Sequence, residues 1–374
     1  MLLNKEKLKE NIDNRLNYDL SQCNVGDVSI IVNQNGETVY ENYFGEAKKD
    51  TIFRLASMTK PVTGVAALIM LSRGKISLDD DVEKYLPAYK NMHIAKLDEN
   101  KNIIDLGESK TKPKILHLLT HTSGIGTGAT GEYYWNNIPA EKNRTLETAV
   151  DYFGGLGLEF EPFTVSFYSP LMGLDVMARI IELTSDMPFD EFVKKEITDP
   201  CEMYDTTFTP TEEQWDRTIR MHNKVDGKNE FISDYGRYKG FSSVEITHFL
   251  GGGGLFSTLH DYSNFAEMLL NKGNFNGKQI IVPEYIDLMA TPHVPTSIMP
   301  GNQQWGLTVR VITDKSYGCL PVGAFGWSGA FGTHFWVDPV NNITAIYCKN
   351  SYYWGGAGSV TAKHFEEDVN ASFN

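Results

Sequence analysis

The chain has 374 residues and a net charge of −14, with a sequence pI of about 5.1. So large an acidic excess argues against a nucleic-acid partner and against binding to an anionic membrane surface, because both attract basic proteins. The length suits one large domain or two intertwined ones, with ample sequence for a buried core.

The start of the chain and its cysteines favour a cytoplasmic location. Residues 4–10 are polar where a signal peptide would be apolar, and the longest apolar run is too short to span a bilayer. The four cysteines are scattered without a Cys-x-x-Cys pair, so the sequence predicts neither a zinc site nor a disulfide scaffold. The sequence does not indicate the oligomeric state.

The first elements in chain order are a helix, a hairpin and a second helix. Residues 5–20 have helical periodicity, and two β-rich runs flank Asn35-Gly36, a strong hairpin signal. A long apolar segment then begins near Ser57, tolerates Pro61 in its first turn and ends at Gly74. This pattern predicts a buried helix with a glycine C-cap.

The remaining elements predict a helical middle followed by strands. Residues 79–270 carry capping residues and proline breaks typical of helices and loops, including a helix at about 260–270. Strand patterns return at 305–311, 333–337 and 343–347, before a closing helix near 360–369. Strands at both ends of the chain indicate one antiparallel sheet with a helical insertion.

Ser57 and Lys60 are the most informative pair in the chain. Helical spacing puts Lys60 one turn after Ser57 on the same face. The positive end of a buried helix favours an alkoxide and disfavours an ammonium, as a serine nucleophile with a lysine base requires. A second Ser-x-x-Lys begins at Ser72, where the helix should end, and we expect no chemistry there.

Further motifs follow this pair in a fixed order across about residues 25–350. They are found at residues 53–60, 74–87, 115–124, 168–169, 200–208 and 251–258. Together they resemble the serine β-lactamase-like family, which includes class C β-lactamases, D,D-peptidases, D-aminopeptidases and family VIII carboxylesterases. The resemblance implies an α+β fold: an antiparallel sheet flanked by helices, with a large helical insertion domain. Residues 1–84 and 300–374 would form the sheet domain and residues 85–299 the mainly helical domain, with the active site in the cleft between them.

The resemblance also implies roles for individual residues. Ser57 would be the nucleophile and Lys60 its proton acceptor, and Tyr168 would share the proton transfer. Ser57 and Ala330 would supply the two backbone N–H groups of an oxyanion hole. Which of Lys60 and Tyr168 takes the serine proton stays open, because the two can titrate as one unit.

The segment around Trp327 resembles the third family motif, which is usually Lys-Thr-Gly or His-x-Gly. Trp327, Ser328 and Gly329 would then line the substrate site, although a glycine-rich turn between strands would explain the same residues. The aromatic residue at 327 removes the cation that would bind a β-lactam carboxylate. Pro170 likewise replaces the asparagine that holds an acylamide group in β-lactamases.

The resemblance implies a cofactor-free serine hydrolase that acts through an acyl-enzyme, and these departures favour small-molecule esters with short to medium acyl groups as its substrates. The alternatives are a D,D-peptidase, a D-aminopeptidase or a weak β-lactamase acting on amides, or an acyltransferase. A catalytically silent relative that only binds ligand is the alternative from another class. His117 and His121 are four residues apart but lack the glutamate of His-Glu-x-x-His, so we expect no metal site there.

Overall fold

Strands lie mainly at the two ends of the chain and helices mainly in its middle. The structure, a computed structural model, describes residues 1–232, 248–356 and 358–374. The helices are α1 (Lys5–Ser21), α2 (Thr59–Ser72), α3 (Ile115–Leu119), α4 (Gly128–Asn136), α5 (Leu146–Gly154), α6 (Met172–Ser185), α7 (Phe189–Val193), α8 (Glu212–Asp216), α9 (Leu259–Leu270), α10 (Pro283–Met289) and α11 (Val360–Asn370). The strands are β1 (Val28–Gln34), β2 (Glu37–Phe44), β3 (Ile52–Arg54), β4 (His93–Leu97), β5 (Ile103–Glu108), β6 (Met221–Val225), β7 (Lys228–Ile232), β8 (Phe256–Thr258), β9 (Asn274–Phe275), β10 (Lys278–Gln279), β11 (Gln303–Trp305), β12 (Arg310–Ile312), β13 (Phe325–Ser328), β14 (His334–Asp338) and β15 (Ile343–Lys349).

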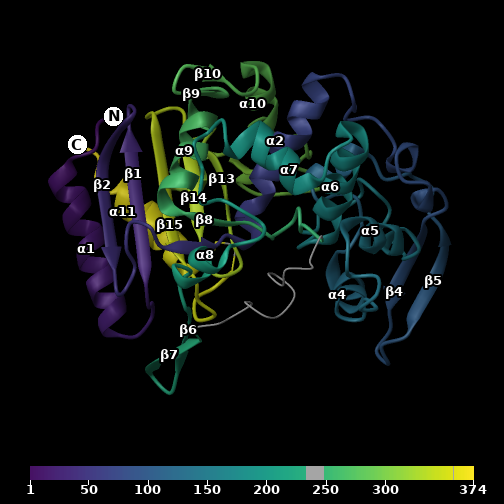
Figure 1. The fold of residues 1–374 in the computed structure, drawn as a ribbon, viewed down its shortest axis with the longest axis horizontal. Helices are drawn as coiled ribbons and strands as arrows, with labels where there is room; N and C mark the ends of the chain where they lie inside the picture. The colour runs from purple at the N-terminus through teal and green to yellow at the C-terminus, as the bar shows by residue number, and fades with distance from the viewer. Residues whose placement is uncertain (233–247, 357) are drawn as a thin grey trace.

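One large antiparallel sheet organises the molecule (Figure 1). Its seven strands run in the order β11-β12-β13-β14-β15-β1-β2, so the N-terminal hairpin lies beside strands from the end of the chain. Every neighbouring pair is antiparallel. The predicted sheet built from both ends of the chain is therefore confirmed.

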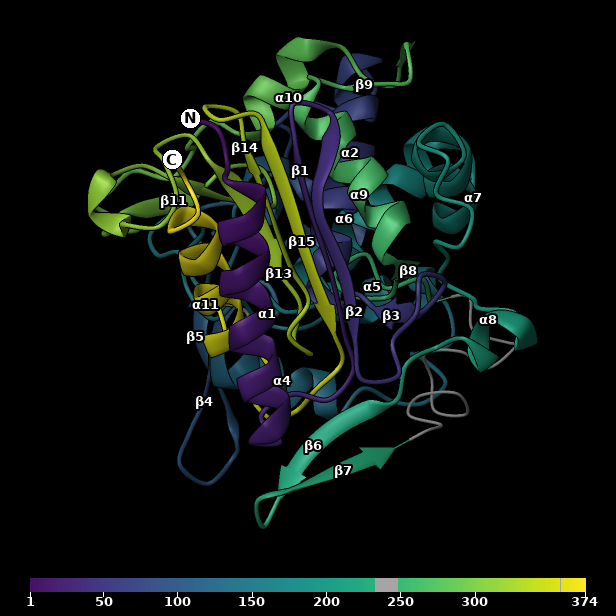
Figure 2. The same ribbon diagram turned by 90° about the vertical axis from the view of Figure 1, so that its left-hand side faces the viewer.

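Both faces of this sheet are covered by helices, as the side chains of β1 show. Ile30 and Val32 belong to the core beneath α1 and α11, which lie side by side over one face (Figure 2). Ile31 points the other way, into the core that contains α2 and α9. Successive strand residues point to opposite faces, so a strand covered on both sides is buried along its whole length, as all of β1 is.

The first hairpin and the buried helix form where the sequence predicts them. Asn35 and Gly36 join β1 to β2 with φ values of +56° and +77°, as a two-residue type I′ turn requires. Helix α2 is buried almost throughout, and Gly74 follows it with φ +66°. That left-handed conformation is the reason a glycine ends this helix.

The middle of the chain contains more strands than its sequence predicts. Besides helices α3 to α9 it carries the two-stranded hairpins β4–β5 and β6–β7 and the short strand β8. Residues 233–247 of this region lie outside the described part of the chain. None of the helices in the described ranges has the length and apolarity needed to cross a membrane. The predicted division into two domains at residues 84 and 300 stays a prediction. Helix α9, which lies between these bounds, packs against β14 and β15 of the large sheet.

The expectation of one continuous strand at 305–311 is wrong. The strand pattern is divided between β11 and β12, which pair with each other across a four-residue connection. Thr308 has φ +68° and donates its N–H to the Leu119 carbonyl at 2.7 Å. Gly306 lies so close to the Met289 carbonyl that a Cβ atom would come within 2.1 Å of it. Contacts with distant segments therefore bend a chain that local propensity would extend.

A buried charged network fixes α11 to the sheet. Glu366 of α11 accepts hydrogen bonds from Arg310 at 2.7 Å and from the Tyr317 hydroxyl at 2.5 Å, and it lies 3.1 Å from His334 Nε2. Burial alone would raise the pKa of Glu366, but the hydrogen bond to His334 and the charge of Arg310 lower it to about 2. The carboxylate is therefore ionised and paired in the folded protein.

We expect Glu366→Gln to lower the free energy of unfolding by about 3–5 kcal/mol at neutral pH, because it leaves a buried guanidinium without its counter-ion. A carboxyl whose pKa is depressed by folding stabilises the protein above its unfolded-state pKa, and the contribution disappears as the pH falls toward the folded-state value. Urea unfolding at pH 7 and at lower pH checks this. The gap between wild type and variant should narrow below about pH 4.3, the ordinary glutamate value, and a gap independent of pH would contradict the assignment.

Candidate active site

Ser57 lies in a tight turn between a buried strand and a buried helix. Strand β3 leads into the 3₁₀ segment η1 (Ala56–Met58), and α2 follows directly. Leu55 donates its N–H to the Leu255 carbonyl at 2.9 Å, which anchors the turn. Ala56 has φ +48°, an uncommon conformation for a residue with a side chain, and strain of this kind is often found at functional sites. Ser57 itself is half-buried.

Lys60 is fully buried beside Ser57, and its side-chain nitrogen has three hydrogen-bond partners. Nζ lies 3.2 Å from Ser57 Oγ, 2.5 Å from the Pro170 carbonyl oxygen and 2.6 Å from the Gly252 carbonyl oxygen. Pro170 and Gly252 come from two distant segments of the chain, whereas Ser57 lies one helical turn away. The helical spacing that suggested the pair therefore corresponds to direct contact, and the carbonyls fix the direction of the amine.

Tyr168 lies against the same amine and inside a group of aromatic rings. Lys60 Nζ is 5.0 Å from the centre of the Tyr168 ring. The ring is stacked on Trp305 at 6.1 Å and 11° and is tilted against Trp327 at 5.3 Å. The Trp327 indole N–H donates to the Tyr168 hydroxyl at 3.3 Å. A hydrogen bond from this N–H would stabilise the negative charge on the Tyr168 oxygen if the tyrosine released its proton.

The residues of the third motif lie on opposite faces of β13. Trp327 faces Tyr168, whereas Ser328 Oγ is buried and lies 2.8 Å from His334 Nδ1 on the neighbouring strand. Gly329 packs against the Leu55 carbonyl, where a Cβ atom would come within 2.3 Å. Strand alternation therefore directs Trp327 toward the other candidate residues and Ser328 toward the buried network of Glu366.

Ala330 follows this close contact with the turn that carries Ser57. Thr333 Oγ1 donates to the Leu55 carbonyl at 3.0 Å, which fixes the 329–333 turn against the residues before Ser57. Among the backbone hydrogen bonds that join turns, loops and caps in the described ranges, none is donated by Ser57 or Ala330. An oxyanion hole formed by these two N–H groups stays a prediction.

An apolar cavity of about 540 Å³ begins at Tyr168. Its lining comes from α4 and the turn before it, the start of α6 and the segment between α5 and α6. It consists of Gly126, Gly128, Ala129, Gly131, Glu132, Trp135, Phe167, Tyr168, Pro170, Leu171 and Met172. Glu132 is the one charged residue in this lining. Because Lys60 hydrogen-bonds to Pro170, the cavity adjoins the candidate catalytic group.

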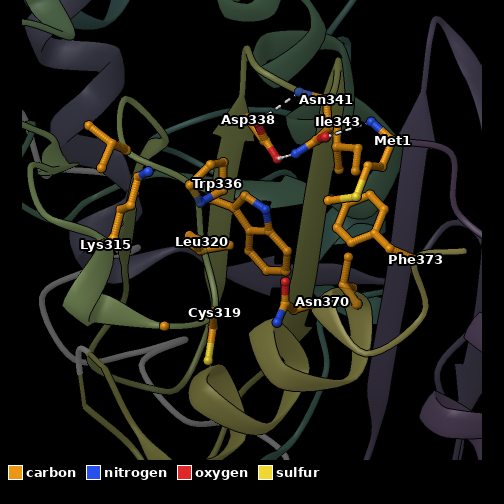
Figure 3. Close-up of a pocket in the computed structure, with 14 residues that line it drawn as sticks. Met1, Lys315, Cys319, Leu320, Trp336, Asp338, Asn341, Ile343, Asn370 and Phe373 are labelled. Atoms are coloured by element: carbon orange, nitrogen blue, oxygen red, sulfur yellow. Dashed lines mark hydrogen bonds between the residues drawn. The ribbon is translucent and has the colours of Figure 1, made fainter.

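A second cavity, of about 290 Å³, lies at the other side of the sheet near both chain ends (Figure 3). Trp336, Leu320, Ile343 and Phe373 form its apolar part, and Asn370 projects into it from α11. No residue of the Ser57 site lines it. Of these two cavities, the one beside Tyr168 is the one that shares a residue with the candidate site.

Two residues that contact Tyr168 were not predicted to belong to the active site. Trp305 falls in what looks like an ordinary strand, and His121 stands out only through its spacing from His117. In the structure His117 belongs to α3 and stacks on Phe163, whereas His121 lies beyond the helix with its ring 4.7 Å from that of Tyr168. In the described ranges no three His, Cys, Asp or Glu side chains form a group able to hold a metal ion.

Comparisons with known proteins agree with this architecture. N-acetylmuramyl-L-alanine amidase of Bacillus subtilis (strain 168) is 24% identical over 383 residues, which cover 92% of this chain and 81% of the amidase. Esterase EstB of Burkholderia gladioli is 24% identical over 370 residues, covering 90% of this chain and 88% of the esterase. The solved structure of EstCE1, a hydrolase with promiscuous acyltransferase activity, superimposes with a TM-score of 0.79 at 22% identity, covering 98% of this chain and 99% of EstCE1.

The likeness to EstCE1 shows the fold, which is the predicted β-lactamase/transpeptidase-like arrangement of an antiparallel sheet and helices. The family assignment comes from the sequence. The Beta-lactamase family model matches residues 8–365, nearly the whole chain. The chain therefore belongs to the Beta-lactamase family, a family of serine hydrolases.

Proposed function

We propose that the protein hydrolyses carboxylic esters with short to medium acyl groups through an acyl-enzyme on Ser57. The observation that carries the proposal is the contact of Lys60 with Ser57, combined with a tryptophan, not a cation, beside Tyr168. The contact between Lys60 and Ser57 provides a nucleophile with a base. Because Trp327 is not a cation, it cannot pair with the carboxylate of a substrate.

The reaction follows from the positions of these groups. Ser57 Oγ attacks the ester carbonyl and gives its proton to the unit formed by Lys60 and Tyr168. The tetrahedral oxyanion is stabilised by the N–H groups of Ser57 and Ala330. Collapse of the intermediate breaks the bond to the alcohol, which leaves with the proton from the same unit. Water then attacks the acyl-enzyme, releases the acid and restores Ser57.

The hydrogen-bond partners of Lys60 are compatible with both the neutral amine and the protonated ammonium. A neutral amine has two N–H groups and one lone pair. The carbonyls of Pro170 and Gly252 would accept the two N–H bonds, and the lone pair would then face the Ser57 hydroxyl. After proton transfer the third N–H would point back to Ser57 Oγ. The amine can therefore exchange a proton with Ser57 without losing either carbonyl partner.

The cavity beside Tyr168 supports an apolar ester group. Phe167, Leu171, Met172 and Trp135 offer apolar surface in its lining. About 540 Å³ exceeds the volume that a two-carbon acyl group fills, so medium-length chains would bury more surface there. The carboxylate of Glu132 would repel an anionic substrate.

The other readings remain as outcomes to be tested. A D,D-peptidase, a D-aminopeptidase or a weak β-lactamase would use the same machinery on an amide. An acyltransferase would pass the acyl group to an acceptor other than water, and a silent relative would bind ligand without turnover.

Trp327 provides the test that separates esters from β-lactams. We expect the wild type to prefer a neutral p-nitrophenyl ester over a cephalosporin in kcat/KM by a large factor. Trp327→Lys should move that ratio toward the cephalosporin by about 10- to 100-fold, since a charge-assisted contact with the carboxylate contributes roughly 1.5–3 kcal/mol.

Trp327→Phe is the matched control, because it also removes the indole N–H from Tyr168 but adds no charge. It should lower turnover of both substrates and leave their ratio close to that of the wild type. If the wild type already hydrolysed cephalosporins as fast as esters, the missing cation would not determine the substrate, and a β-lactamase would replace the esterase as the proposed function.

A further inference from the structure

His121 holds the backbone on both sides of Tyr168. Its own carbonyl accepts the N–H of Phe167 at 3.0 Å, and its ring Nδ1 accepts the N–H of Ser169 at 3.2 Å. The residue between these two bonds is Tyr168, whose ring lies 4.7 Å from the imidazole. Three contacts from one side chain and its backbone therefore converge on one residue.

The chemical state of His121 is fixed by its surroundings. The side chain is fully buried, and burial together with the positive charge of Lys60 lowers its pKa far below the ordinary histidine value. The imidazole is therefore neutral. Because Nδ1 accepts from Ser169, the proton is on Nε2, which finds no hydrogen-bond partner among the described residues. The ring also contacts Trp305, with 4.5 Å between the ring centres.

The backbone of His121 is shaped for this task. Its φ of +55° is left-handed, a conformation uncommon for residues other than glycine and several-fold enriched for histidine and asparagine. The turn directs the carbonyl toward Phe167, while the side chain reaches Ser169. Each bond satisfies a buried polar group of His121, and the pair also fixes the backbone on either side of Tyr168.

We propose that neutral His121 is a positioning residue for Tyr168: its Nδ1 lone pair and its carbonyl hold the 167–169 backbone so that the Tyr168 hydroxyl stays in place for proton transfer. The inference rests on the proposed function, because Tyr168 must take part in the reaction for its position to affect turnover. In the described part of the chain His121 has no hydrogen bond with Ser57, so in this proposal it acts through Tyr168. Misplacing a reacting group by about 1 Å can cost 100-fold in rate, so the expected effect is large.

Two amide variants isolate the Nδ1 acceptor. In His121→Asn the side-chain oxygen occupies the position of Nδ1, and asparagine also tolerates the left-handed backbone. In His121→Gln the amide reaches the position of Nε2, so the acceptor for Ser169 is displaced. Both lose the aromatic ring, and thermal unfolding checks that both remain folded. We expect His121→Asn to keep kcat within about 3-fold of the wild type. We expect His121→Gln to lower kcat by about 10- to 100-fold with little change in KM.

The Tyr168→Phe background shows whether the effect passes through the tyrosine. There His121→Gln should cost nothing further, because no hydroxyl remains to be positioned. Equal kcat values for the two amide variants, or a full His121→Gln loss in the Tyr168→Phe background, would overturn the proposal. Amide hydrogen exchange at Ser169 provides a readout that needs no substrate: it should be slow in wild type and His121→Asn and fast in His121→Gln. If no ester were turned over by the wild type, the proposed function would fail, and equal exchange in all three proteins would overturn the positioning role by itself.

Discussion

Ser57→Ala is expected to abolish hydrolysis of short p-nitrophenyl esters. Lys60 Nζ is 3.2 Å from Ser57 Oγ, and its other two partners are backbone carbonyls, which cannot replace a nucleophile. Removing an essential nucleophile commonly costs about 10⁶-fold in kcat. Initial rates measured at saturating ester, with the variant purified free of host esterases, give the comparison.

Ser72→Ala is the matched control, because Ser72 begins the second Ser-x-x-Lys pattern. Ser72 is the last residue of α2, and its hydroxyl donates to the Ile69 carbonyl at 2.8 Å. Its removal should leave turnover nearly unchanged. If Ser72→Ala abolished turnover and Ser57→Ala did not, the assignment of the active site to Ser57 would be wrong.

Lys60→Ala and Tyr168→Phe should each lower kcat by at least about 100-fold with modest effect on KM. Both groups act on the proton that leaves Ser57, so their contribution belongs to the transition state and not to substrate binding. Lys60→Ala also removes the donor to the Pro170 carbonyl and leaves the carbonyl of buried Gly252 unsatisfied, and the second loss costs about 1–3 kcal/mol of stability. Thermal unfolding must therefore accompany the kinetics.

The double variant tests whether the two residues form one unit. Lys60 Nζ lies 5.0 Å from the centre of the Tyr168 ring, close enough for direct coupling. Once one member of a proton-transfer unit is lost, removing the other should cost much less. The loss in the double variant should therefore be far smaller than the sum of the two single losses in free energy. Additive losses would show that Lys60 and Tyr168 act independently.

The parts of the fold that local sequence specifies were predictable. Asn35-Gly36 requires a left-handed turn, which fixes the β1–β2 hairpin, and an apolar run followed by Gly74 specifies α2. The contact between Ser57 and Lys60 is of the same kind, because helical spacing alone brings them together. These features depend on residues a few positions apart.

Features set by distant contacts could not be predicted in the same way. The break between β11 and β12 depends on Thr308 reaching Leu119 and on Gly306 packing against Met289. The hairpin β4–β5 has a fully exposed second strand and lacks the buried alternation by which strands are usually identified.

In the candidate site, too, contacts between residues close in sequence were predictable and contacts between distant residues were not. Family resemblance suggested Tyr168 and Trp327, but their hydrogen bond links residues 159 positions apart. The role inferred for His121 depends on its backbone conformation and on two amide groups of another segment, none of which its spacing from His117 indicates.

Covalent labelling of Ser57 tests the central claim most directly. Intact-protein mass spectrometry after incubation with a phosphonate ester should show one phosphonyl adduct on the wild type, and peptide mapping should place it on Ser57. Ser57→Ala should remain unlabelled under the same conditions, and a penicillin tested in parallel should give little adduct. No adduct with either reagent, or an adduct on another residue, would contradict a serine hydrolase mechanism at Ser57.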